Sequence, residues 1–594
     1  MPLPDRPARR STTGVLLVLM AVLALLVPAG ATAHRQPKPP VDIQFLNVSD
    51  WHGNIDPLSG IGGSAAISSF WQYDRSLNPN TITLTAGDDF GATPPLSGFF
   101  NEEPAVLAER IMGIQVGTFG NHNFDRGTTH LQSMIKLAGA RTDATHPGTP
   151  FRYVTSNLTN LYQNLKGVAP MEFFRVGGIT VAVIGVTNPE APGLVTPGNF
   201  GTIVPSDPVK AANKARILAR LAGASVVVAI THMGVRGFDS SGNAFGELVD
   251  FATASHGFDV IFGDHTDIQY SGTINGQLVH ENRSFGVTYA KTSVTVDPNT
   301  RKVTAKSVTF VSPSLTLLAS QGLTPDPAIE AMVAPYRTQL SALLDGKIGT
   351  ATDIFQRGGN LERRQETPSG DLITDGMRWK YGTDIAVLTG GSIRQPLPAC
   401  AYAPADHTLH RSGYATAPNT NLQPCTGYAA GAPYDLVTGD VYAILPFGNT
   451  IVTRSITGAQ IWSMLENGVS RFAADGTNGQ GRFVQASGLK YTFHYLNASG
   501  CTGDDTVKTS WVCVPSRVTA VSLADGTPIP NDATAFSMAT TNFTNAGGDA
   551  MWMLADGQGV SRDLDANVML DYMQFAGPVF DPNAYPLDRV TKLP

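Results

Sequence analysis

The sequence has few charged residues and few cysteines, and it lacks the basic character of nucleic-acid-binding proteins. Only 15% of its 594 residues are charged, and the formal net charge is −7. Binding to the phosphate backbone of DNA or RNA needs a basic surface, so we expect no polymeric nucleic acid as a partner. The chain also has no apolar segment at its C-terminus, so we expect no membrane anchor there.

The N-terminal segment has the three parts of a secretory signal peptide. A basic region, an apolar core and a small-residue cleavage site follow one another: Arg6, Arg9 and Arg10; residues 14–27; and Ala31–Ala33. An uncleaved anchor is the alternative, but the apolar run is shorter than the ~20 residues that span a membrane. We therefore expect a signal peptide at residues 1–33 and a secreted protein, extracellular or periplasm-like, without a stable membrane anchor.

The four cysteines lie in the C-terminal half of the chain: Cys400, Cys425, Cys501 and Cys513. An even, locally clustered set in an exported protein indicates disulfides. Pairing of nearest neighbours would close two loops rich in Pro, Gly, Asn and Thr. A zinc cluster is the alternative, but the C-x-x-C spacing that such a site uses is absent from the sequence.

The pattern of apolar residues predicts more than one domain, since single cores rarely exceed about 250–300 residues. Strands alternate with helices, such as 107–112 and 211–222, up to about residue 265. A predicted hairpin of residues 284–296 and 302–311 follows. This order predicts an α/β domain.

A predicted helix at residues 325–344 marks a change of composition, and we interpret it as a connector. The expected division is a domain at 40–315, a connector at 316–345 and a second domain at 346–594. The second domain has one clear predicted helix, 370–380, and we expect residues 400–435 to be a long surface insertion.

Side chains that bind metals follow a series of short apolar strands. The strands are residues 43–48, 81–84, 226–230 and 260–262. The side chains are Asp50, His52, Asp88, Asn121, His122, His232, His265 and Asp267. Functional groups of α/β proteins collect where strands end, and divalent metals take histidine nitrogen together with carboxylate or amide oxygen. The pattern therefore predicts a metal centre.

The ordered motifs D-x-H, G-D, G-N-H-x-x-D, a lone H and G-D-H-x-D resemble those of calcineurin-like metallophosphoesterases. With the C-terminal half, the resemblance narrows to the secreted 5′-nucleotidase family and covers about residues 40–594. It implies a four-layer αββα metallophosphoesterase sandwich followed by an α+β substrate-binding domain. Two divalent ions, drawn from Zn, Mn, Mg, Ca and Fe, are implied with it.

The resemblance also assigns the ligands. Asp50, His52 and Asp267 would hold the first ion, Asn121, His232 and His265 the second, and Asp88 both. His122 would stabilise the transition state, oriented by Asp125. Taken singly, His122 is equally consistent with a loop histidine and Asp125 with a helix N-cap.

Two residues depart from the family pattern. Asn123 stands where the family usually has Glu, but that position is not a direct ligand. Asp267 replaces the usual His, Asn or Gln, and its extra negative charge favours harder ions such as Mn²⁺, Mg²⁺ or Ca²⁺. We interpret the neighbouring Asp89 and Asp264 as supports for the ligands.

The C-terminal half carries the residues that the resemblance assigns to substrate binding. Arg363 and Arg394 would bind the phosphate, because guanidinium groups hold it through two parallel hydrogen bonds. Phe447 and Phe543 would stack on the nucleobase, and Asp549 would bind the ribose hydroxyls. The alternatives are structural salt bridges for the arginines and core positions for the rings.

The implied function is a metal-dependent phosphoric ester hydrolase of nucleotide catabolism. It would release phosphate from nucleoside 5′-monophosphates by attack of a metal-bridging hydroxide, with di- and triphosphates left open as substrates. A UDP-sugar hydrolase and a 2′,3′-cyclic-nucleotide phosphodiesterase are alternatives on the same scaffold. A non-catalytic nucleotide-binding surface protein is a further alternative, against which the intact set of metal-type residues argues.

Overall fold

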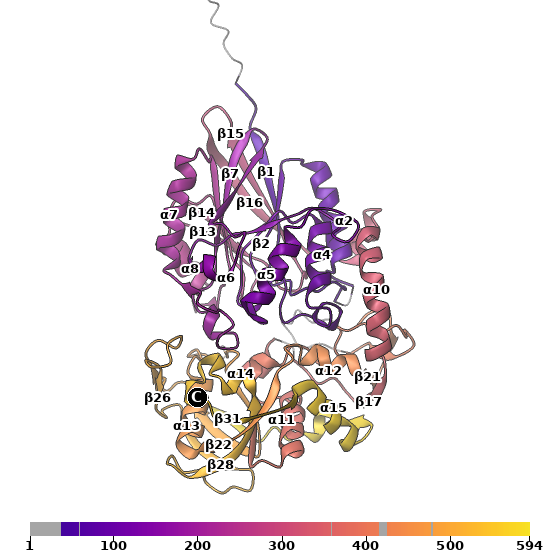
Figure 1. Ribbon diagram of the computed structural model, residues 1–594, viewed down its shortest axis with the longest axis vertical. Coiled ribbons are helices and arrows are strands. Elements are labelled where there is room, and N and C mark those ends of the chain that lie inside the picture. Colours follow the sequence, from indigo (N-terminus) through magenta and orange to yellow (C-terminus); the bar gives the residue numbers. More distant parts are fainter. Residues whose placement is uncertain (1–36, 59, 358, 415–424, 477–478) are drawn as a thin grey trace, which may run out of the picture.

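The chain folds into an upper N-terminal part and a lower C-terminal part (Figure 1). The computed structural model describes residues 37–594, apart from residues 59, 358, 415–424 and 477–478. The expected signal peptide at residues 1–33 lies outside the described residues. None of the helices in the described ranges is both long and apolar enough to cross a membrane.

Two mixed six-stranded sheets form the centre of the N-terminal part. The first has the order β16 (Lys302–Val311), β15 (Tyr289–Asp297), β1 (Val41–Val48), β2 (Thr81–Thr85), β3 (Val116–Gly117) and β4 (Arg152–Tyr153). The second has the order β13 (Tyr270–Ile274), β14 (Gln277–Glu281), β12 (Val260–Phe262), β9 (Val226–Thr231), β7 (Ile179–Val186) and β6 (Met171–Val176). Strands β1 to β4 run parallel to one another, as do β7, β9, β12 and β14.

The two sheets pack face to face through buried aliphatic and aromatic side chains. Phe45 of β1 meets Phe262 of β12 with ring centroids 5.6 Å apart. The neighbouring Leu46 faces the opposite way, into a second cluster, because successive side chains of a strand alternate between the two faces of a sheet. Strand β9 is buried along its whole length, as expected for a parallel strand covered on both faces.

Helices cover the two outer faces. The first sheet is covered by α2 (Ser64–Leu77), α4 (Glu103–Met112) and α5 (Gly127–Ala138), and the second by α7 (Pro208–Leu221) and α8 (Glu247–Ala254). In α7, Ala212, Ala215 and Ala219 form the buried stripe that packs on the sheet. The predicted α/β fold with four αββα layers is therefore confirmed (Figure 1).

Helix α10 (Pro327–Leu344) follows the short helix α9 (Leu315–Ser320) and runs along one side of the molecule into the C-terminal part (Figure 1). Asp326 caps its N-terminus by accepting a hydrogen bond from the Ala328 amide at 2.9 Å. The helix packs on α2, α4 and the short α3 (Pro95–Gly98) and also on α12 (Thr438–Ile444). One hydrophobic cluster consequently continues from the N-terminal helices into the C-terminal part.

The C-terminal part is built on a mixed five-stranded sheet between helices. The order is β23 (Val484–Ser487), β18 (Ile385–Thr389), β28 (Ala535–Thr541), β22 (Thr450–Thr457) and β29 (Val560–Leu564). Helices α11 (Pro368–Tyr381) and α15 (Asp565–Ala576) lie on one face and α13 (Gly458–Val469) on the other. Two three-stranded sheets flank it: β21 (Tyr434–Val437), β17 (Lys347–Ala351) and β30 (Val579–Phe580); and β27 (Val518–Leu523), β24 (Leu489–His494) and β31 (Val590–Leu593).

Short elements complete the fold. Four strand pairs are β10 (Gly237–Phe238) with β11 (Ala244–Phe245), β5 (Leu158–Thr159) with β8 (Val204–Pro205), β19 (His410–Ser412) with β20 (Ala429–Ala430), and β25 (Cys501–Thr502) with β26 (Val512–Cys513). Two single-turn helices are α6 (Leu161–Asn164) and α14 (Asn542–Asn545).

Both disulfides join nearest neighbours in the sequence. Cys400 bonds Cys425, and Cys501 bonds Cys513. The predicted pairing is confirmed, and the alternative zinc cluster is wrong because all four sulfurs are engaged.

Two local predictions were wrong. The strand expected from residue 284 begins only at Tyr289, because Phe285 and Gly286 turn the chain with φ of 59° and 71°. The segment 400–435 is also no simple surface insertion where it is described. Its Arg411 is fully buried and forms a 2.7 Å ion pair with Asp440 of α12.

Candidate active site

The predicted metal-type residues lie in loops that follow the strands of both sheets. Asp50 and His52 follow β1, Asp88 follows β2, Asn121 and His122 follow β3, His232 follows β9, and His265 and Asp267 follow β12. Five of these residues have left-handed backbone, with φ of 42° at Asp50, 49° at His52, 46° at Asp88, 92° at His265 and 62° at Asp267. Non-glycine residues rarely adopt this conformation, and such strain concentrates at functional sites.

One side of the cluster joins two histidines, an aspartate and an asparagine. His232 Nε2 lies 3.0 Å from Asp88 Oδ2 and 3.3 Å from Asn121 Oδ1. His265 Nδ1 lies 3.1 Å from the same His232 nitrogen. His232 is fully buried. Four donor atoms therefore converge on one small volume.

The other side contains His52 and Asp50. His52 Nδ1 donates to the Gly91 carbonyl at 2.8 Å, which leaves Nε2 as a lone-pair donor 3.7 Å from Asp50 Oδ1. Burial lowers the pKa of His52 well below its usual value, so the ring is held in the neutral form that binds metals. Asp88 belongs both to a close group with His52 and His122 and to one with His232 and His265, as a residue shared by two ions would.

Asp264 supports this cluster from behind. Its Oδ2 accepts a hydrogen bond from the Asp50 amide at 3.1 Å and lies 3.4 Å from His232 Nδ1. This contact orients His232 so that its Nε2 faces Asp88. Asp267, by contrast, belongs to none of the close groups found among the described residues, although it lines the adjoining cavity beside His265.

His122 connects the cluster to the cavity. Its amide donates to Asp88 Oδ1 at 2.7 Å, and its Nδ1 lies 3.0 Å from Asp125 Oδ2. The same Asp125 oxygen accepts from the Ala92 amide at 3.1 Å. Asp125 therefore fixes the ring through Nδ1 and leaves Nε2 for a ligand in the cavity that His122 lines.

The Asn123 side chain forms hydrogen bonds with two of the loops that carry predicted metal ligands. Its Oδ1 accepts from the Asp88 amide at 3.2 Å and from the Gly120 amide at 2.8 Å. Its Nδ2 donates to Asp89 Oδ1 at 2.6 Å, and Tyr153 donates to the other Asp89 oxygen. An amide at this position thus satisfies donors and an acceptor together, which explains physically why Asn is tolerated here.

Five arginines line the C-terminal face of the cavity: Arg357, Arg363, Arg364, Arg394 and Arg482. The fully buried Glu362 lies between two of them, with its Oε1 3.3 Å from Arg357 Nε and 3.8 Å from Arg363 Nε. Burial, followed by repulsion from Arg363 and Arg357, lowers the pKa of Arg394 to about 10. Among the described residues of the C-terminal part, five arginines and one acidic residue, Asp549, line the cavity, so this face carries excess positive charge, as an anion site requires.

Sequence reasoning missed Arg357 and Phe285. Arg357 precedes Gly359 and Asn360 in a loop after β17, a glycine-containing context that could have drawn attention to it. Phe285 lies on the turn that replaces the expected strand, 5.7 Å from the His52 ring, and it lines the cavity. Its only signal was the following glycine.

The two predicted base-binding rings both line the cavity, but they differ in their surroundings. Phe447 stacks on His122, with centroids 5.7 Å apart and 22° between planes, and Arg394 lies 5.8 Å from its centre. Phe543 packs against Gly548, where an added Cβ would lie 2.3 Å from the ring. Asp549 follows with φ of 55° and is buried at the same wall.

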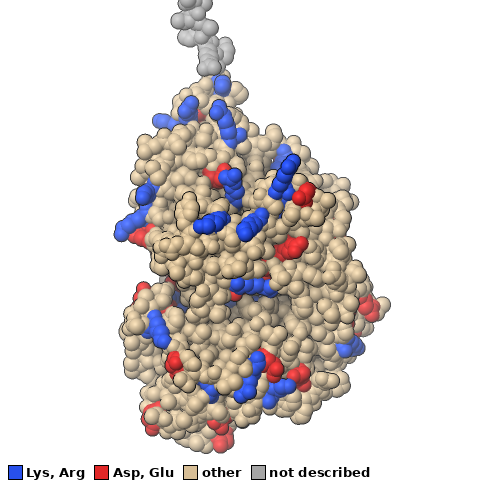
Figure 2. Space-filling model, viewed as in Figure 1, with Lys and Arg blue, Asp and Glu red and all other residues tan. Residues whose placement is uncertain are grey.

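The cavity lies between the two parts of the chain and has a volume of about 900 Å³. His122, His265 and Asp267 line it from the N-terminal part, and Arg394, Phe543 and Asp549 from the C-terminal part. Figure 2 shows a hollow where the two parts meet. All the predicted substrate-side residues and five of the predicted metal-centre and catalytic residues therefore face a single space.

Comparison with known proteins places this architecture in a class. A family model described as the 5′-nucleotidase, C-terminal domain matches residues 347–556. The crystal structure of a 5′-nucleotidase precursor from Thermus thermophilus superposes with a TM-score of 0.72 and 24% identity, covering 93% of this chain and 99% of that one. This chain and that 5′-nucleotidase precursor thus share one fold.

The curated relatives extend the match along the chain. Human 5′-nucleotidase is 22% identical over 96% of this chain and 92% of its own length. Endonuclease YhcR of Bacillus subtilis is 26% identical over 85% of this chain, but this chain spans only 37% of that protein. Residues 347–556 thus match the C-terminal domain of 5′-nucleotidases, and the chain is similar to 5′-nucleotidases over nearly its whole length.

Proposed function

We propose that this protein releases phosphate from nucleoside 5′-monophosphates with the help of two divalent metal ions. The observation that supports this most is the shared cavity. A cluster of histidines and carboxylates opens into it on one side, and five arginines line it on the other. A phosphate held by the arginines would face the metal-binding cluster, with His122 between them.

The residues present fit the metal ions. The His232 and His265 nitrogens lie 3.1 Å apart beside the carboxylate of Asp88, and this mixed set of nitrogen and oxygen donors suits divalent ions. When bound, two such ions supply an acidified water and stabilise the negative charge of a phosphoryl group. Asp50, His52 and Asp267 would hold one ion, Asn121, His232 and His265 the other, and Asp88 both.

The remaining roles belong to the protein's own side chains. His122, oriented by Asp125, would donate a hydrogen bond or a proton at the leaving oxygen. Arg357, Arg363 and Arg394 would position the phosphate. Phe447 and Phe543 would stack on the base, and Asp549 would bind the ribose hydroxyls.

Release of inorganic phosphate from AMP, with and without EDTA, tests this function. We expect turnover that EDTA abolishes and that Mn²⁺ or Zn²⁺ restores. UDP-glucose, 2′,3′-cyclic AMP, ADP and ATP in the same assay separate the alternatives. Preference for UDP-glucose or the cyclic nucleotide would replace the proposed substrate, and binding of AMP without any turnover would indicate a non-catalytic nucleotide-binding protein.

The proposal includes export of the protein after removal of residues 1–33. The two disulfides support it, because disulfides persist in oxidising compartments. Mass spectrometry of the protein from the culture medium or cell envelope should give a mature N-terminus at His34. An intact N-terminus on cytosolic protein would contradict export.

A further inference from the structure

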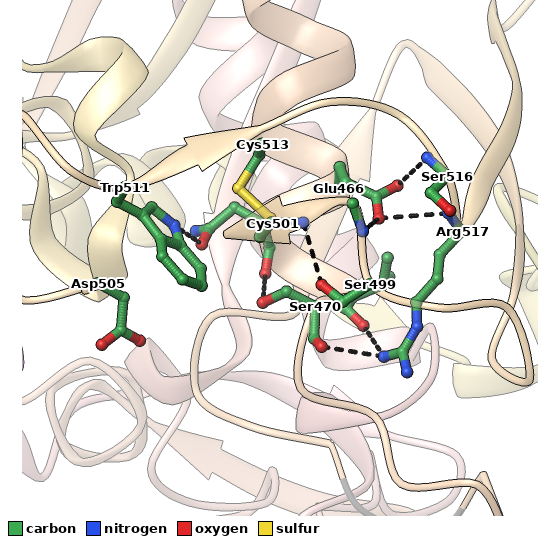
Figure 3. Close-up of a disulfide and its surroundings, with 12 residues drawn as sticks. Glu466, Ser470, Ser499, Cys501, Asp505, Trp511, Cys513, Ser516 and Arg517 are labelled. Carbon is green, nitrogen blue, oxygen red and sulfur yellow. Dashed lines mark hydrogen bonds between the residues drawn. A yellow bond between two sulfur atoms is a disulfide. The ribbon is translucent and has the colours of Figure 1, made fainter. Parts of the chain in front are cut away.

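A disulfide-closed hairpin, residues 500–517, lies on α13 of the C-terminal part (Figure 3). Cys501 and Cys513 are paired residues of β25 and β26. The buried Glu466 of α13 holds both ends, accepting from the amides of Gly500 at 2.9 Å, Ser516 at 3.0 Å and Val518 at 2.9 Å. The base of the hairpin is therefore fixed by the disulfide and by one carboxylate.

The tip of this hairpin presents Asp505 to two arginines. Asp505 Oδ2 lies 2.8 Å from Arg482 and also bonds Arg471. Although burial opposes it, Arg482 and then Arg471 hold the pKa of Asp505 below its usual value. Arg482 is buried and lines the cavity beside Asp549. Asp505 itself does not line the cavity among the described residues.

Further contacts tie the same hairpin to the loop that carries Asp549. Trp511 donates to Asn467 Oδ1 at 3.0 Å, and Asn467 Nδ2 donates to the Asp549 carbonyl at 3.0 Å. Trp552 donates from its ring nitrogen to the Asp505 carbonyl at 2.8 Å. The Trp552 ring also packs so closely on Gly547 that an added Cβ would lie 2.4 Å from it.

We propose that Asp505 and Arg482 are positioning residues for the nucleoside end of the cavity, and that the Cys501–Cys513 disulfide keeps them in place. Asp505 holds the Arg482 guanidinium, whose second amine bonds Asn467 at 3.3 Å. Arg482 in turn supplies the positive charge next to the buried Asp549 carboxylate. The hairpin thus sets the orientation of the group assigned to the ribose. This inference rests on the proposed nucleotidase function.

The substitution Asp505→Asn tests the proposal. Loss of a charged hydrogen-bond partner should raise KM for AMP about tenfold, with kcat changed less than about twofold. KM for 4-nitrophenyl phosphate, which has no ribose, should change much less. Discrimination between AMP and 2′,3′-dideoxy-AMP should fall, because Asp549 would no longer be held toward the hydroxyls. Equal changes on all three substrates would overturn the proposal.

A matched control is Asp504→Asn, the same change at the exposed neighbouring residue. Asp504 Oδ1 accepts from the Thr506 amide at 2.9 Å, which an asparagine oxygen can also do. We expect wild-type KM values for all substrates. If wild-type protein shows no AMP hydrolysis, the proposed function falls together with this inference. If it hydrolyses AMP and Asp505→Asn behaves like Asp504→Asn, only this inference falls.

Two further comparisons separate the hairpin from other causes. Arg471 also lies 3.6 Å from Glu190 of the N-terminal part, so Asp505 could act through this interdomain ion pair. Glu190→Gln removes that pair, together with the contact of Glu190 with Arg236, and leaves Asp505 intact. Reproduction of the Asp505→Asn effects by this variant would overturn the proposal. The pair Cys501→Ala/Cys513→Ala should reproduce them, whereas Cys400→Ala/Cys425→Ala, if folded by circular dichroism, should not.

Discussion

The two faces of the cavity differ in charge and in how they are built. The N-terminal face presents imidazoles and carboxylates on short loops after strands of two sheets, with left-handed backbone at five predicted ligand positions. The C-terminal face presents guanidinium groups and phenyl rings on longer loops around α11, α12 and α14. The first arrangement suits chemistry at phosphorus, and the second suits recognition of the phosphate and nucleoside.

One contact joins the two faces of the cavity. Phe447 comes from the C-terminal face but stacks on His122 of the N-terminal face. Phe447 is distant along the chain from the predicted metal ligands, and the family resemblance assigns its ring only to the base. Its position beside His122 implies that this one aromatic residue influences both binding and turnover. The predictions below test whether residues of one face affect turnover and residues of the other face affect substrate binding.

The largest effect is expected at the carboxylate shared by the two metal groups. Asp88→Asn should lower turnover by at least about 10²–10³-fold for AMP and 4-nitrophenyl phosphate alike, because both substrates need the metals. Metal content, measured by inductively coupled plasma mass spectrometry, should fall with it. Asp250→Asn, at an exposed position of α8, is the control. Wild-type turnover in metal-loaded Asp88→Asn protein would remove the two-metal assignment.

His122→Ala should lower kcat by about 10²–10⁴-fold with metal content unchanged. The ring lies at the cavity, so its loss should affect both substrates, while KM for AMP should change little. Steady-state kinetics and metal analysis on the same preparation provide the measurement. The exposed His256→Ala serves as the control. A loss of activity explained wholly by missing metal would make His122 a structural support instead.

The two phenylalanines should give different results. Phe543→Ala should weaken AMP binding by about 1–3 kcal/mol and spare 4-nitrophenyl phosphate. Phe447→Ala should also lower kcat for both substrates, because the ring supports His122. The exposed Phe575→Ala on α15 is the control. Identical effects of the two substitutions on both substrates, with a lower melting temperature, would assign both rings to the core.

The smallest effect on activity is expected outside both faces, at Asp371. Burial, followed by Glu366 and Asp375, raises the pKa of Asp371 to about 9, although Arg589 opposes the shift. The folded protein therefore keeps a proton that the unfolded chain loses near pH 4, so stability falls as pH rises from about 4 to 9.

Asp371→Asn cannot ionise, so its melting temperature should fall less between pH 5 and pH 9 than that of the wild type, by about 2–4 °C. Differential scanning fluorimetry measures this, and AMP turnover should remain close to wild type. A steeper fall for the variant would contradict the assigned shift.

The sequence predicted the strands beneath the N-terminal face because their signals are local. Most of the predicted ligands follow apolar strands that the pattern indicated, and β1, β2, β9 and β12 lie close to the predicted positions. Because β1 and β2 are parallel, as are β9 and β12, the loops that follow them lie at the same edge of each sheet. Helix α10 was also recognisable from the helical spacing of its apolar residues.

The features that escaped prediction depend on contacts between distant segments. Asn123 and Asp89 form a bridge that only the fold brings together. Asp505 reaches Arg482 across a hairpin whose register the sequence does not specify. The Phe285 turn replaced a strand because its backbone bonds the Asp50 carbonyl, a contact with another loop.

Anomalous diffraction from crystals grown with Mn²⁺ and phosphate tests most directly whether the cavity binds metal ions on one face and phosphate on the other. The account predicts two anomalous peaks about 3.5–4 Å apart, with Asp88 between them, and a phosphate within hydrogen-bonding distance of Arg394. Peaks at other residues, or a phosphate bound away from the arginines and the metal ions, would contradict it.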